Sequence, residues 1–136
     1  MERIEDTILR NLLYNEEFAR KTLPFIKDEY FSQYTDKSVF NEIYKYFDKF
    51  SNLPSKEALI IELSDRNDLT EDQFGITTEL LNEAEATHQK ENREDLVWLL
   101  ERSEKFCQDK ALYNAITDSI GIFDESSKSE ISKDAI

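Results

Sequence analysis

The feature that most constrains this chain is a long stretch near its C-terminal end that lacks helix breakers. From Leu96 to Phe123 there is no proline and only one glycine, so these 28 residues can form one helix about 42 Å long. Apolar residues recur along it every seven positions, close to one line on the helix surface. This heptad row consists of Leu99, Phe106, Tyr113 and Ile120.

A second apolar strip adjoins the heptad row and makes the apolar surface wider than one partner helix would cover. Its members are Trp98, Leu112, Ile116 and Phe123. We therefore predict an oligomer interface on the long helix, formed by residues of both sets. A symmetric pair of long helices is the simplest closed arrangement.

The residues after the long helix predict a short polar break. Asp124 to Ser129 are polar, and Ser127 with Glu130 has the form of a capping box that begins a new helix. Only about six residues of that helix would remain, too few to be stable, so we expect a truncated helical hairpin. The predicted organisation is a helical globular subdomain over 1–91, a long hairpin helix over 92–125, and a linker with the start of a return helix over 126–136.

The rest of the chain predicts an all-α fold with five shorter helices. It has two glycines and two prolines among 136 residues, and strand-like alternation is not sustained anywhere. Helical spacing predicts segments over about 4–14, 16–27 and 36–50, with Pro24 bending or breaking the second. In the third, Phe40, Ile43, Phe47 and Phe50 are expected to face inward.

Three local patterns predict where helices begin. Asn15 can cap the second helix, and Ser55 follows a proline and can cap the fourth. Thr70 with Gln73 three residues later has the form of a capping box for the fifth.

The charge and the apolar runs exclude several classes of protein. Thirty acidic and seventeen basic residues give a net charge of -13, which argues against a surface that neutralises phosphates. Apolar runs are too short to span a membrane, and the acidic N-terminus is unlike a signal peptide. A lone cysteine, Cys107, fits a reducing compartment, so we expect a cytoplasmic protein that does not bind membranes.

No motif predicts catalytic, cofactor-binding or metal-binding residues in this chain. His88 and Cys107 are the only histidine and thiol, too few for a zinc site or a histidine-based triad. Neither a phosphate-binding loop nor a dinucleotide fingerprint is present. An enzyme that uses a pair of the chain's many acids remains an alternative without sequence support.

Two sets of residues predict docking of a partner protein. Between Arg66 and Lys90 there are six acids and no base, which indicates either a solvated helix face or a docking surface for a basic protein, with Glu79 and Glu83 in its centre. Tyr44 and Tyr46 lie off the apolar stripe of their helix. They are surface residues, contacts to a neighbouring helix, or part of a partner site.

The residues at the helix junctions resemble the N-terminal domain of DnaB-type hexameric replicative helicases, most closely those of large T-even-type bacteriophages. The likeness covers nearly the whole chain. It is carried by Glu29-Tyr30-Phe31, Phe40 with Ile43, Leu53-Pro54-Ser55 with Ala58-Leu59, Glu104-Lys105-Phe106-Cys107-Gln108, and Ala111-Leu112-Tyr113-Asn114-Ala115.

The resemblance implies an assembly domain without catalysis of its own. In that family the helical hairpins pair between subunits into a collar on the hexamer, primase docks there, and a separate motor domain binds ATP and magnesium and moves on single-stranded DNA. The expected partners are thus other copies of this chain and primase or another replisome protein, with DNA contacted only through the motor. The alternative is a stand-alone helical adaptor that dimerises and has no motor domain.

Overall fold

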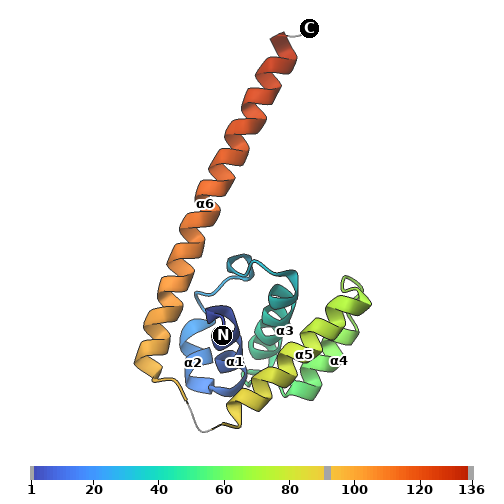
Figure 1. Cartoon of the computed structure of the whole chain (residues 1–136), viewed down its shortest axis with the longest axis vertical. Coiled ribbons are helices and arrows are strands. Elements are labelled where there is room, and N and C mark those ends of the chain that lie inside the picture. The colour runs from blue at the N-terminus through green and yellow to red at the C-terminus, as the bar shows by residue number, and fades with distance from the viewer. Residues whose placement is uncertain (1, 91–92, 135–136) are drawn as a thin grey trace.

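The computed structural model describes residues 2–90 and 93–134 and is helical throughout its regular structure (Figure 1). Within these ranges there is no strand, which confirms the predicted all-α class. The elements in chain order are α1 (Ile4–Tyr14), α2 (Glu16–Thr22), the short 3-10 helix η1 (Asp28–Tyr30), α3 (Tyr34–Phe50), α4 (Lys56–Ser64), α5 (Glu71–His88) and α6 (Leu96–Asp134).

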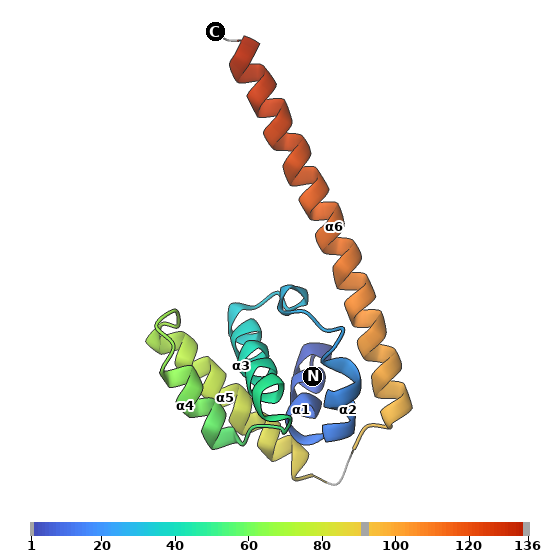
Figure 2. The same ribbon diagram turned by 180° about the vertical axis from the view of Figure 1, so that it is seen from behind.

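Helix α1 lies at the centre of a globule made by the first five α-helices. It packs against α2, α3 and α5, and α6 contacts it from outside the globule (Figures 1 and 2). Ile8, Leu9 and Leu12 of α1 are fully buried. This follows from their spacing, which places them together on one side of the helix.

The three predicted helix starts are confirmed by their hydrogen bonds. The Asn15 side chain accepts from the Phe18 backbone N–H at 3.0 Å, and Ser55 Oγ accepts from the Ala58 N–H at 3.0 Å. Thr70 and Gln73 form the reciprocal capping box, with distances of 3.1 and 2.9 Å. Each cap satisfies a backbone donor that the first helical turn leaves unpaired.

Helix α2 is shorter than predicted. It ends at Thr22, with Leu23 as its C-terminal cap, where the sequence pattern predicts a helix to about Lys27. The cause is Pro24, which has no N–H to donate to the helical ladder, although Leu23 before it keeps helical dihedral angles.

The predicted inward face of α3 is correct in its first half and wrong at its end. Phe40 and Ile43 are buried, whereas Phe50 is 51% exposed and Phe47 is half-buried. The last turn of α3 lies at the surface, where the Phe50 ring packs on Tyr46 at 4.7 Å between centroids. The guanidinium of Arg20 covers the outer side of Phe47 at 5.3 Å.

Arg66 organises the connection between α4 and α5 through a network of hydrogen bonds. Arg66 donates to Asp68 at 2.6 Å and to Glu42 on α3 at 3.1 Å, and Tyr34 donates to the same Asp68. Hydrogen bonds from Arg66 and Tyr34 lower the pKa of Asp68. This network fixes the α4–α5 connection against α3.

Helix α6 is continuous where the sequence pattern predicts a break at Asp124 to Ser129. It runs through Asp134, so the new helix predicted from Ser127 is part of α6. The segment contains neither glycine nor proline, so no residue in it prevents the helix from continuing. The division into a globular subdomain and a hairpin remains a prediction, and residues 91–92 and 135–136 lie outside the described residues.

Candidate assembly and docking surfaces

The first half of α6 belongs to the core of the chain. Leu99 is fully buried and Phe106 is 6% exposed, and the Phe106 ring lies 5.7 Å from that of Phe31. These two residues of the heptad row are covered by α1, α2 and η1. Their assignment to an oligomer interface is therefore corrected: a seven-residue period indicates that a surface is covered, but not whether the cover comes from the same chain.

Cys107 lies beside Phe106 in the same buried face. Burial raises the pKa of its thiol to about 11. At neutral pH it is therefore protonated, and it acts as a small apolar side chain in the packing.

Helix α6 leaves the globule near Asn114. The side-chain amide of Asn114 donates to the Glu29 carbonyl at 3.0 Å and ties this point of the helix to the segment of η1. Residues 115–121 are all exposed, and the helix continues away from the globule (Figures 1 and 2).

The projecting part of α6 carries a row of apolar side chains in solvent. Leu112, Tyr113, Ile116 and Ile120 are 63%, 65%, 52% and 57% exposed, and we call them the exposed row. Residues 112, 116 and 120 are four apart and so lie on one face of the helix. Trp98, near the start of α6, is also 45% exposed. Trp98, Tyr113, Ile116 and Ile120 remain a predicted interface, and the side chain of Phe123 lies outside the described residues.

The predicted docking residues lie on two separate surfaces. Glu79 and Glu83 are exposed on α5 and line hollows beside the N-terminal part of α1. Tyr44 is 45% exposed and lines a different hollow, formed with the α2–α3 connection. Tyr46 is half-buried against Phe50.

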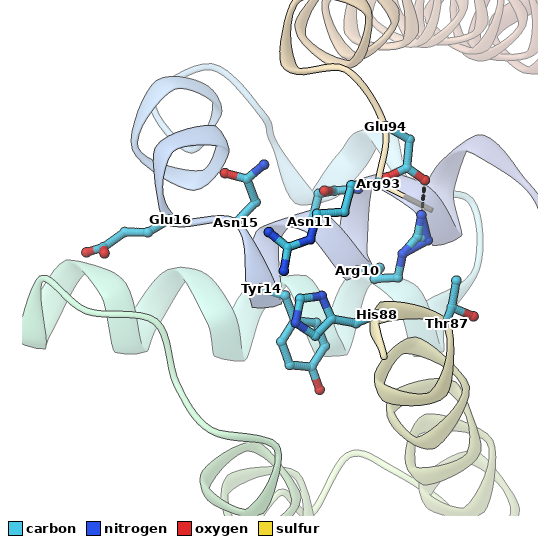
Figure 3. Close-up of a pocket in the computed structure, with 9 residues that line it drawn as sticks. All are labelled: Arg10, Asn11, Tyr14, Asn15, Glu16, Thr87, His88, Arg93 and Glu94. Carbon is cyan, nitrogen blue, oxygen red and sulfur yellow. Dashed lines mark hydrogen bonds and ion pairs between the residues drawn. The ribbon is translucent and has the colours of Figure 1, made fainter. Parts of the chain in front are cut away.

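A polar cavity of about 210 Å³, which sequence reasoning missed, lies where α1, α2, α5 and the segment before α6 meet (Figure 3). The rings of Tyr14 and His88 stack there, 4.2 Å apart and nearly parallel. Arg10 is buried and donates both to Glu94 and, at 2.9 Å, to Glu2. Its charge is thus matched by two carboxylates, and the ion pairs join α1 to the segments that precede α1 and α6.

The same cavity shifts the titration of Glu94. Burial acts to raise the pKa of this carboxyl, but hydrogen bonds, led by the one from Arg10, outweigh it and lower the pKa. The arrangement holds a carboxylate in place and offers no nucleophile beside a base. The Arg10–Glu94 pair holds the segment that precedes α6 against α1.

Neither a cluster of metal-binding side chains nor a membrane-spanning helix is found among the described residues. No group of three or more histidine, cysteine, aspartate or glutamate side chains in it is placed to hold a metal ion. No helix in it combines the length and the hydropathy that a membrane crossing needs.

The fold and its surfaces define a class: a small all-α domain with a projecting helix that carries an exposed apolar row. No protein-family model matches the sequence. A DnaB-like replicative helicase of Enterobacteria phage T4 is 26% identical to this chain over 117 residues. The alignment covers 86% of this chain and 23% of the helicase, so the chain spans about a quarter of the length of this relative. The similarity supports a relationship to DnaB-like replicative helicases.

Proposed function

We propose that this chain is the N-terminal assembly and primase-docking domain of a hexameric replicative DNA helicase. The observation that carries the proposal is the exposed row on α6. Four large apolar side chains, each more than half exposed, lie together on α6 where the helix leaves its own globule and beyond that point. Large exposed apolar patches of this kind mark interaction sites on soluble proteins.

The exposed row favours pairing with a second copy of the same helix. Leu112, Ile116 and Ile120 form a narrow line, which fits another helix better than it fits a flat surface. A twofold pair would bury the same residues on both chains and leave the two globules free. The globules are then available for docking of primase or another replisome protein.

The relationship to a replicative helicase supports the wider assignment. In this proposal the parent protein uses ATP and magnesium to unwind DNA, and a motor domain that is not part of this sequence binds the nucleotide and the single strand. This chain has no phosphate-binding loop and contributes assembly and docking.

Two double variants of α6 test the assembly role. Ile116→Glu with Ile120→Glu places two charges in the exposed row and should dissociate the assembly at micromolar concentration. Ala115→Glu with Ser119→Glu adds the same charge at the same spacing, one position earlier, and so on a different face. This control should leave the assembly intact.

Sedimentation velocity on the wild-type chain and both variants is the measurement. Circular dichroism checks that each variant keeps its helix content. A wild-type chain that stays monomeric at high concentration, or equal dissociation by both variants, would contradict the assembly role.

A further inference from the structure

A continuous groove runs between the N-terminal part of α1 and helix α5. It consists of two hollows of about 240 and 470 Å³, which share Asp6, Leu80 and Glu83 in their linings. The larger hollow has the size of a cleft that takes up side chains or a small ligand, roughly 300 to 1,000 Å³. We call the two together the α1–α5 groove.

One side of the groove is apolar. Ile76, Leu80 and Ala84 follow one another every four residues along α5, and all three line the groove. Ile76 is 50% exposed, although isoleucine is among the residues most often buried. The line offers a contact for apolar side chains on a partner.

The neighbouring line of α5 and the facing part of α1 are acidic. Glu79 and Glu83 are four residues apart and lie directly beside the apolar line. Among the described residues, no cation lies within 4.0 Å of either carboxylate. Asp6 of α1 lines both hollows and pairs with Arg3. The larger hollow is also lined by Glu2, which pairs with Arg10, and by Lys90.

Asp36, a buried carboxylate whose charge is only partly neutralised, lines the smaller of the two hollows. The Asp36 side chain is 1% exposed, and its Oδ2 receives no hydrogen bond from any described residue. Arg3 Nη2 lies 3.2 Å from that oxygen, but the same guanidinium also pairs with Asp6 at 2.7 Å and with Glu5 at 3.7 Å. One cation is thus shared among three carboxylates, and the end of the groove stays negative.

We infer that the α1–α5 groove binds a basic amphipathic helix of another protein. Its apolar side chains would contact Ile76 and Leu80, and its lysines or arginines would pair with Glu79, Glu83 and Asp6. This inference rests on the docking part of the proposed function and deepens it by naming the site and the class of partner.

Charge decides between the possible occupants of the groove. A second copy of this chain carries a net charge of -13 and is repelled by an acidic groove. Nucleic acid is excluded for the same reason, since its phosphates need cations. A basic segment satisfies the unpaired carboxylates and covers the apolar line at the same time.

A synthetic helix of leucines flanked by lysines, labelled with fluorescein, serves as the probe. Its binding to the whole chain is measured by fluorescence anisotropy at low and at high salt. Glu79→Lys with Glu83→Lys should weaken binding about tenfold at low salt, because two attractive charges become repulsive. The control, Glu62→Lys with Glu101→Lys, makes the same change in net charge at exposed acids elsewhere and should alter binding by less than about twofold.

The apolar contact is tested separately. Ile76→Ser should weaken binding severalfold at both salt concentrations, and a probe with serines in place of the leucines should bind weakly to the wild-type chain. Circular dichroism checks the fold of each variant. Equal losses in the two charge-reversal variants, equal binding of the serine probe, or no binding at all would overturn the inference.

Sedimentation of the Glu79→Lys, Glu83→Lys variant separates the groove from the assembly surface. Unchanged self-association supports a groove for a different protein, and altered self-association would make it a contact between copies and overturn the inference. A chain that binds the probe but stays monomeric keeps the groove and loses the assembly role. These measurements therefore distinguish failure of the groove inference from failure of the proposed assembly role.

Discussion

At the scale of single residues, the phenylalanines of this chain differ widely in burial. Phe31 is fully buried and contacts the rings of Phe40 at 5.3 Å and Phe106 at 5.7 Å, so it joins α3 to α6. Phe31→Ala should lower the free energy of unfolding by about 3 to 5 kcal/mol. Phe50→Ala, at an exposed position, should lower it by less than about 1 kcal/mol. Chemical denaturation measures both, and similar losses would contradict this placement of the core.

A second residue-scale prediction concerns the pH dependence of stability. The pKa of Glu94 is lowered in the folded chain, so its contribution to stability is present above the ordinary glutamate pKa of roughly 4.3 and is lost as the pH falls through and below that value. Glu94→Gln should therefore destabilise the chain near neutral pH by about 1 kcal/mol or less, since the carboxyl is partly exposed. The difference from wild type should shrink towards pH 3. A difference independent of pH would mean that the Arg10 pair does not stabilise the fold.

At the scale of helices, the sequence predicts helix starts better than it predicts which surface a helix covers. The caps at Asn15, Ser55 and Thr70 depend on neighbours three residues away, and all are confirmed. The break at Pro24 is equally local: α2 ends just before this proline, although the apolar pattern alone extends to about Lys27. Local rules need no tertiary information.

Predictions that depended on distant contacts were less successful. The heptad row of α6 is divided by the globule: Leu99 and Phe106 are buried in this chain, and Tyr113 and Ile120 are exposed. The apolar spacing along α6 does not indicate at which residue the helix leaves the globule. The same reason explains why the sequence predicts only part of the α1–α5 groove. Glu79 and Glu83 stand out in the sequence as acids, but only the fold brings Asp6 and Asp36 next to them.

At the scale of the whole molecule, the net charge of -13 predicts that the chain does not bind nucleic acid. We expect no measurable change in the anisotropy of a labelled single-stranded oligonucleotide at low salt, where attraction to phosphates would be strongest. A protein of similar size and positive charge is the control. Binding that falls steeply with added salt would contradict the prediction and would point to a cationic surface.

The length of α6 has a mechanical consequence. The helix contains 39 residues, and the hydrogen bond from Asn114 to the Glu29 carbonyl ties it to the globule. The remaining turns form a lever about 30 Å long, at 1.5 Å per residue. A tilt of roughly ten degrees at its base moves the far end by about 5 Å, with no change in the packing of the globule. In the proposed assembly, a rigid arm of this kind would allow one globule to adjust its angle to its neighbours while the far end stays paired.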